Sequence, residues 1–169
     1  MATIKEWRTG KVRFANAKKS IKTLVEENKT NLSGVGLSGI DLKYSDLSNA
    51  HLNDADLSGA ILIGTNFSGA DLSGTNFRQA DLHCADLSGT DLHYADLRGA
   101  DLSRAYLVRA NLNGTNIQDT NLDGAKLNGT DLSTTDLRNA NLRHSDLNNV
   151  EISMRQIDDI ISGIGIIVL

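Results

Sequence analysis

The chain has 169 residues, enough for one domain, and combines 40% hydrophobic residues with only 4% aromatic residues and no proline. So few aromatic residues argue against a conventional mixed core, and the single cysteine excludes a disulfide framework within the chain. The net charge of −4 is divided unevenly: eight Lys or Arg against three Glu give residues 1–29 a charge of +5, whereas eight against sixteen Asp or Glu give residues 30–154 a charge of −8.

Residues 1–29 are predicted to form an N-terminal helical cap. The pattern favours a short helix over residues 17–28, with three apolar residues on one side: Ile21, Leu24 and Val25. Trp7, Val12 and Phe14 are expected to pack beneath it. The basic residues are spread over a helix and a loop, which favours a solvated surface over nucleic-acid binding. No apolar run typical of a signal peptide is present in this segment, so a cytoplasmic location is expected.

From Leu32 to Ile152, every fifth residue is Leu, Phe or Ile, and the register never slips. Five residues turn an α-helix by roughly 500°, so a helix would spread these residues over all its sides. On a flat strand, an odd period sends them to alternate faces. The period therefore predicts short extended pieces separated by corners, with the chain coiled around a core of central residues: Leu42, Leu52, Leu62, Phe67, Leu72, Phe77, Leu82, Leu92, Leu102, Leu112, Leu122, Leu132 and Leu142.

The residues around each central position follow a pattern as well. A small residue stands two places before it, Asp or Asn one place before it, and Gly two places after it in 11 of 25 repeats. The small residue shares the inner face with the central one, and Asp or Asn points outward. Gly, Asn and Asp suit a corner with a positive φ angle. A different turn type is expected where bulkier residues hold the corner: Tyr44, Cys84, Tyr94, Arg104, Arg109 and His144.

If each repeat turns a quarter circle, four repeats make a coil of 20 residues and the segment forms about six coils. Stacked at the β-ladder spacing of roughly 4.8 Å, these coils give a rod about 30 Å long. Positions 20 apart in the sequence then lie in one column along the rod.

The repeat resembles that of the pentapeptide-repeat family. Ala70–Gly74 and Ala85–Gly89 both match its A(D/N)LxG motif in full, and the resemblance covers about residues 30–154. It implies an all-β fold, a right-handed quadrilateral parallel β-helix. We therefore expect three parts: a helical cap over residues 1–29, the repeat rod over 30–154, and a helical cap with a tail over 155–169.

At the C-terminal end, Ser153–Gln156 reads as a capping box and predicts a helix over Met154–Ile161. Three isoleucines are expected to face the last coil: Ile157, Ile160 and Ile161. The apolar tail that follows is too short to span a bilayer, and no membrane association is expected. It either completes the cap or pairs with another copy, which would give a homodimer through the C-terminal end.

Three outward surfaces are distinctive. One face carries acidic residues and no Lys or Arg: Asp54, Asp71, Asp91, Asp131 and Glu151. A second face stacks Arg78, Arg98 and Arg138, expected to pair with neighbouring aspartates, with anion binding as the alternative. Apolar residues gather on the other two faces as a candidate protein-contact surface: Tyr44, Ile61 and Ile63 on one, Tyr106, Val108 and Arg109 on the next. The alternative is scattered surface hydrophobes, or cover by a terminal segment.

The sequence offers no catalytic, cofactor or metal site. All four histidines stand at outward positions too far apart to share a metal, and Cys84 has no activating neighbour beyond His83. Carboxylates on a convex rod lack a cleft that would tune them for acid–base chemistry. We therefore expect a protein that is not an enzyme and uses no cofactor.

Three functions fit these sequence features. The first is a rigid rod that presents flat faces to a protein partner, without direct nucleic-acid binding. The second, implied by the family resemblance, is a DNA mimic that binds and protects DNA gyrase or topoisomerase. The third, also implied by the family, is a regulatory protein of photosynthetic bacteria.

Overall fold

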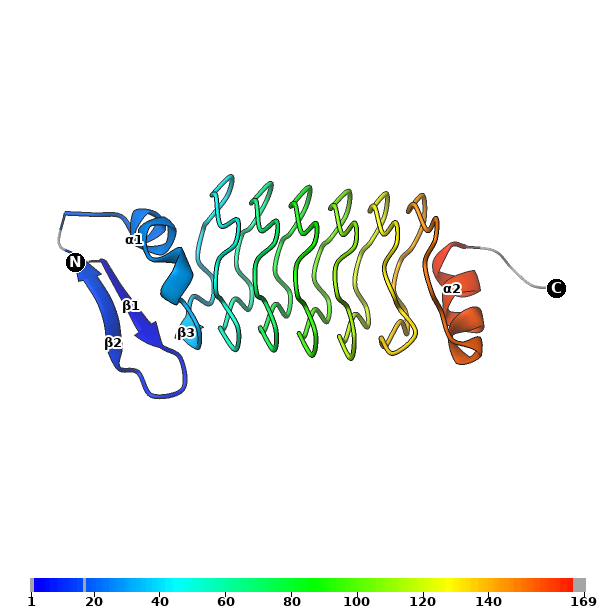
Figure 1. Ribbon diagram of the computed structural model, residues 1–169, viewed down its shortest axis with the longest axis horizontal. Coiled ribbons are helices and arrows are strands. Elements are labelled where there is room, and N and C mark those ends of the chain that lie inside the picture. The colour runs from blue at the N-terminus through cyan, green and yellow to red at the C-terminus, as the bar shows by residue number, and fades with distance from the viewer. Residues whose placement is uncertain (1, 17, 166–169) are drawn as a thin grey trace.

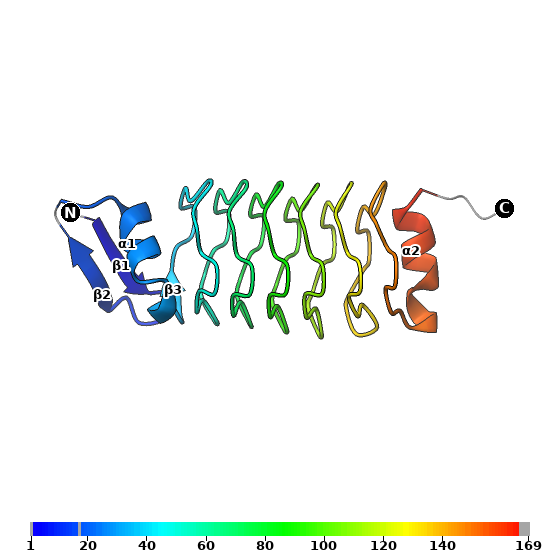
Figure 2. The ribbon, with the colours of Figure 1, turned by 45° about the horizontal axis from the view of Figure 1, so that its top comes forward.

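The structure is a computed structural model that describes residues 2–16 and 18–165. Figures 1 and 2 show a rod of stacked coils, with a β-hairpin and helix α1 at one end and helix α2 at the other. The elements, in chain order, are β1 (Ala2–Glu6), β2 (Val12–Asn16), α1 (Ile21–Glu27), the 3-10 turn Lys29–Asn31, β3 (Val35–Gly36), the 3-10 turn Met154–Gln156 and α2 (Ile157–Gly163).

Each coil contains 20 residues, because parallel β-bridges join residues 20 apart, from Gly36↔Asp56 to Asp131↔Glu151. One coil therefore comprises four pentapeptides and has four faces. Along most of the rod, three backbone hydrogen bonds on each face join one coil to the next, and we call this set a rung. In one example, the N–H groups of Leu72, Gly74 and Asp91 donate to the carbonyl oxygens of Asp91, His93 and Ala70 at 2.8, 2.9 and 3.0 Å.

The core is a stack of the central residues. All thirteen residues predicted for it, from Leu42 to Leu142, are at most 2% exposed, and Phe67 and Phe77 meet edge to face with ring centroids 6.2 Å apart. Small residues complete the inner surface, and where threonine replaces alanine its hydroxyl bonds to a carbonyl, as Thr65 does to Leu42 at 2.8 Å. Ile152, the last central position, is 43% exposed, because no further coil stacks on it.

The expectation of a different turn type at bulky corners was wrong. Tyr44, Cys84, Tyr94, Arg104, Arg109 and His144 all have φ between 55° and 58°, in the left-handed region. That conformation costs a non-glycine residue roughly 1–2 kcal/mol. The rungs on both sides of a corner fix the backbone there, so the ladder overrides the local preference.

The outward Asp and Asn residues have a local role that the repeat pattern alone did not reveal. Their side-chain oxygen accepts a hydrogen bond from the backbone N–H two residues later, as Asp86 does from Ser88 at 2.9 Å and Asp71 from Ser73 at 3.1 Å. Only a short side chain with an acceptor oxygen closes this turn, which explains why Asp and Asn recur before the central residue.

The N-terminal segment is more than a helical cap, and that prediction is corrected. Strands β1 and β2 form an antiparallel hairpin, and β1 also pairs with β3 of the first coil in the sheet order β2-β1-β3. The hairpin thus covers a ladder edge that would otherwise be free to associate. Gly36 replaces the usual Asp because a Cβ there would lie 3.0 Å from the Cβ of Trp7.

Helix α1 begins at Ile21, later than predicted, because the Ser20 side chain accepts a hydrogen bond from the Thr23 N–H and caps it. Leu24 and Val25 are buried. Trp7 and Val12 do not lie beneath the helix, since they are 41% and 49% exposed. Val12 lies in β2 with about half of its surface exposed, and Trp7, which follows β1, places its indole against the Asp54 carbonyl of the rod.

At the C-terminal end, the Ser153 N–H donates to the Gln156 side-chain oxygen at 2.8 Å, as the capping box predicts. The first turn is nevertheless 3-10, and α2 begins only at Ile157. Of the three isoleucines predicted to face the last coil, Ile160 packs against the core, and Ile164 does so as well. Ile157 and Ile161 are partly buried like them but are not part of that contact, so the inner face is shifted from the predicted one. The rest of the predicted tail, residues 166–169, lies outside the described residues. No helix within the described ranges is long and apolar enough to cross a membrane.

Candidate functional site

The four faces of the rod carry different side chains, and we number them by their central residues. Face one is centred on Leu72 and Leu92, face two on Phe77 and Leu97, face three on Leu62 and Leu82, and face four on Leu87 and Leu107. The register of the β-bridges fixes which residues share each face.

The apolar contact surface is defined here as Tyr44, Ile61, Ile63, Tyr106, Val108 and Arg109. The two tyrosines are 76% and 50% exposed, whereas the three aliphatic side chains are partly buried. The Tyr44 N–H bonds to the Ile63 carbonyl at 2.9 Å, and its ring lies against Gly64. The structure thus joins Tyr44 to Ile61 and Ile63 on face three. Tyr106, Val108 and Arg109 form a second group on face four.

Face two holds the arginine column, in which two of the three arginines pair with aspartate. Arg98 bonds to Asp96 at 2.8 and 2.5 Å, and Arg138 bonds to Asp136 at the same two distances. Hydrogen bonding to its arginine lowers the pKa of each of these two carboxyls below its usual value. Within the described residues, Arg78 has no carboxylate at ion-pair distance, because Asn76 stands where the others have Asp.

Face one is the acidic face. Hydrogen bonds from the Ser133 side chain and backbone lower the pKa of Asp131. Asp91 accepts from Asn111 at 2.9 Å and contacts the Nδ1 atom of His93 at 2.7 Å. Burial raises the pKa of Asp91, but the bonds from His93 and Asn111 outweigh it and the net shift is downward. These carboxylates therefore remain charged at neutral pH.

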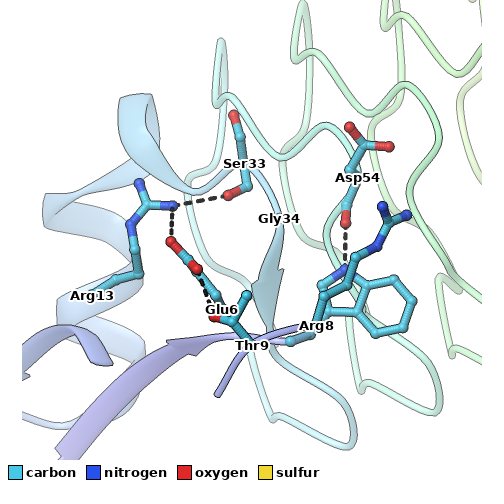
Figure 3. A pocket seen from close by; sticks show the side chains of 8 residues that line it. Glu6, Arg8, Thr9, Arg13, Ser33, Gly34 and Asp54 are labelled. Carbon is cyan, nitrogen blue, oxygen red and sulfur yellow. Dashed lines mark hydrogen bonds and ion pairs between the residues drawn. The ribbon is translucent and has the colours of Figure 1, made fainter. Parts of the chain in front are cut away.

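Beside face one, the hairpin forms an open depression of about 310 Å³ that the sequence did not predict (Figure 3). The Trp7 Nε1–H donates to the Asp54 carbonyl at 2.7 Å, and the Arg8 guanidinium carbon lies 5.3 Å from the centre of the indole ring. Arg13 lies 3.9 Å from Glu6 across the depression. Two acids and two arginines line it, so its charges favour neither a cation nor an anion.

The histidines lie apart, and the side chains of His83, His93 and His144 each contact a different polar neighbour. The His83 Nε2 is 3.3 Å from the Cys84 sulfur, and its Nδ1 is 2.8 Å from the Ser103 hydroxyl. His144 contacts Asp123 at 2.7 Å. Among residues 2–16 and 18–165, no three His, Cys, Asp or Glu side chains are grouped so that they could hold a metal ion.

This geometry defines a β-solenoid protein built from five-residue repeats, with flat outer faces. A family model described as pentapeptide repeats matches the chain in 8 copies, over residues 30–69, 40–79, 60–93, 85–124 and 115–153. The chain therefore belongs to the pentapeptide-repeat family. A search of curated proteins finds no match.

Several solved structures are similar to this chain. A trypsin-treated form of QnrB1, a plasmid-mediated fluoroquinolone resistance protein, is 20% identical with a TM-score of 0.47, and the match covers 83% of this chain and 93% of that one. HetL, involved in heterocyst differentiation regulation in the cyanobacterium Nostoc sp. strain PCC 7120, is 28% identical with a TM-score of 0.27, covering 70% and 72%. A pentapeptide repeat protein from the Arabidopsis thaliana thylakoid lumen is 33% identical with a TM-score of 0.20, covering 71% and 73%.

Proposed function

We propose that the chain is a non-catalytic interaction module: a right-handed quadrilateral rod, closed by the hairpin and α1 at one end and by α2 at the other, that offers flat faces to a protein partner. The partner binds at the apolar contact surface on faces three and four. The exposure of Tyr44 and Tyr106, 76% and 50%, is the observation that carries this proposal. Exposed aromatic side chains beside an arginine are typical of the residues that dominate binding energy in protein interfaces.

The rigidity of the rod supports this function. Each coil is joined to the next by rungs, and the side chains on faces three and four stand on a backbone that the ladder fixes. Because the backbone of this surface is already ordered, binding of a partner costs the rod little conformational entropy. The apolar surface thus acts as a preformed contact.

Two substitutions test the contact surface without disturbing the fold. Ile63→Asp places Asp in a column that already contains Asp123, and Tyr106→Asp introduces the residue most common at its repeat position. Capture of partners from the native cell with the full chain should lose the same protein with both variants. The matched control is Gln118→Asp, at the repeat position of Ile63 but on face two. If both variants capture that protein as well as the parent chain does, the proposal is wrong.

A second candidate function is the DNA mimic that protects DNA gyrase or topoisomerase. Face one supports it, because its acidic residues Asp54, Asp71, Asp91 and Asp131 share their face with no Lys or Arg. Charge density argues against it. Duplex DNA carries one negative charge about every 1.7 Å, hence about 18 over a rod about 30 Å long, whereas residues 30–154 carry a net charge of −8. A gyrase supercoiling assay with a quinolone present separates the two functions, since protection supports the mimic and its absence excludes it.

A third candidate is a regulatory role in photosynthetic bacteria. Its support is membership of the pentapeptide-repeat family, and no described side chain favours it over the contact surface. In the native organism, deletion of the gene with a measured change in differentiation or photosynthetic growth would test it.

We further propose that two copies associate through their C-terminal ends. Ile152 and Met154 are 43% and 84% exposed, and Ile157 and Ile161 of α2 are partly exposed beside them. Two apolar residues so exposed at the end of a solenoid favour contact with another chain. Light scattering should show a dimer for the parent chain and a monomer for Met154→Lys, with Gln118→Lys as a control of equal charge. A parent chain that is monomeric at high concentration would exclude this association.

A further inference from the structure

One rung of the ladder is open. On face one, the N–H groups of Leu112 and Asp131 have no backbone acceptor among the described residues, although the equivalent groups of Leu92 and Asn111 bond at 2.9 Å each. The Gly114 N–H bonds to the Thr134 hydroxyl at 3.0 Å, instead of to a backbone carbonyl. The bridge between residues 111 and 131 is likewise missing from the otherwise regular series of bridges.

The cause is the residue at the corner. Every other corner from Gly34 to Asn149 has a positive φ angle, but Thr134 does not. Threonine is β-branched, and its branched side chain makes the left-handed conformation costly. Figure 1 shows a rounder corner in the yellow coil than in the green coils before it. The one corner without a positive φ angle thus belongs to the rung whose backbone bonds are missing.

The opening is confined to face one. The next three bridges along the chain are formed, between residues 116 and 136, 121 and 141, and 126 and 146. On the other side of the open rung, the Leu132 N–H bonds to the Glu151 carbonyl at 2.8 Å. The Gln156 amide also bonds to the Leu132 and Thr135 carbonyls. Residues 131–133 are thus tied to the C-terminal coil and not to the coil before them.

We propose that this open rung is a built-in opening point of the rod. The last coils and α2, residues 130–163, separate as one unit from the coils before them, and the separation begins on face one, where the rung is open. Thr134 sets the position of this opening. The proposal concerns the rod alone and does not depend on the proposed binding function.

Hydrogen exchange of the intact chain tests the opening directly. In native conditions, the amides of Leu112 and Asp131 should exchange at least about tenfold faster than those of Leu92 and Asn111 in the intact rung before them. At low denaturant, the amides of Asp136, Asn141 and Asp146, whose acceptors Thr115, Thr120 and Ala125 lie in the coil before the unit, should share one opening rate that leaves residues 37–107 protected. Equal protection of both rungs, or a single opening of the whole rod, would overturn the proposal.

Three variants test the cause. Thr134→Gly supplies the residue that corners prefer, so it should close the rung and slow exchange at Leu112 and Asp131 to the level of Leu92. Thr134→Val keeps the β-branch without the hydroxyl, so exchange there should remain fast. Asn139→Gly is the control for glycine itself, at a corner where φ is already 59°. Unchanged exchange in Thr134→Gly, or slowed exchange in Thr134→Val, would show that the β-branched corner is not the cause.

Discussion

The side-chain amide of Gln156 donates a hydrogen bond to the Thr135 carbonyl at 2.9 Å, in the place of a backbone N–H. In a regular coil, the carbonyl of the small residue accepts from the N–H 21 residues later, as Ala50 does from Asp71 at 2.9 Å. By that register, the Thr135 carbonyl would accept from the backbone of Gln156. That N–H instead bonds to the Ser153 carbonyl at 3.0 Å, and the side chain takes over. The Gln156 side chain therefore replaces a ladder N–H at the C-terminal end of the rod and keeps the buried Thr135 carbonyl paired.

Replacing Gln156 should destabilise the rod from its C-terminal end. Gln156→Leu keeps the bulk of the side chain but leaves the Thr135 carbonyl without a donor, whereas the Leu132 carbonyl still accepts from the Thr135 N–H and hydroxyl at 2.9 and 2.7 Å. An unsatisfied buried polar group costs about 1–3 kcal/mol, so urea denaturation should show a loss of that size. Gln118→Leu, on face two, is the control and should change stability by no more than about 0.5 kcal/mol. Equal effects of the two variants would refute the role of Gln156.

The corner glycines should respond unequally to alanine. A Cβ at Gly64 would lie 2.8 Å from the Tyr44 ring, whereas one at Gly59 meets nothing within 4 Å. Both have positive φ, so each Ala costs roughly 1–2 kcal/mol for its backbone alone. Gly64→Ala should therefore destabilise the rod more than Gly59→Ala. Combining Gly64→Ala with Tyr44→Ala should remove this additional loss of stability. Thermal denaturation of the three single variants and the double variant measures this coupling, and an additive double variant would contradict it.

Glycine at a strained corner should stabilise the rod, contrary to its usual effect. Arg109 has a φ of 57° and no ion pair within the described residues. In Arg109→Gly, relief of the left-handed conformation exceeds the loss of chain entropy, so we expect a gain of about 0.5–1 kcal/mol in the free energy of unfolding. Ser88→Gly, one repeat position before a corner, is the control and should destabilise. A lower thermal midpoint for Arg109→Gly as well as for Ser88→Gly would contradict the expected stabilisation.

The paired aspartates should make stability fall in acid. Hydrogen bonding to Arg98 and Arg138 lowers the pKa of Asp96 and Asp136 in the folded chain. Their contribution is therefore complete above the unfolded-state pKa, about 3.9, and is lost as the pH falls through the lower folded-state pKa. NMR titration should show the pKa of Asp96 rising toward its usual value in Arg98→Gln. An unchanged pKa in that variant would show that Arg98 is not the cause.

Sequence patterns predicted the structure correctly where each repeat determines its own conformation. The five-residue period alone placed residues such as Leu82 and Leu122 inside, and both are at most 1% exposed. The hairpin was not predicted, although Gly10 lies between two short segments, residues 2–6 and 12–16, in which apolar and polar residues largely alternate. The role of the Gln156 side chain was not predicted either, because the carbonyls that this side chain reaches are 21 and 24 residues away.

The sequence by itself determined the coil. Each five-residue repeat places a small residue and a large residue inside, a polar residue outside and a turn at the corner, and four such repeats complete one coil. Only the tertiary structure decided the corners and the ends. Tyr44 and Arg109 adopt a backbone conformation that their own preferences oppose, since the rungs on either side hold them there. Thr134 stands at an equivalent corner and does not adopt it, because a β-branched side chain raises the cost beyond what the ladder enforces.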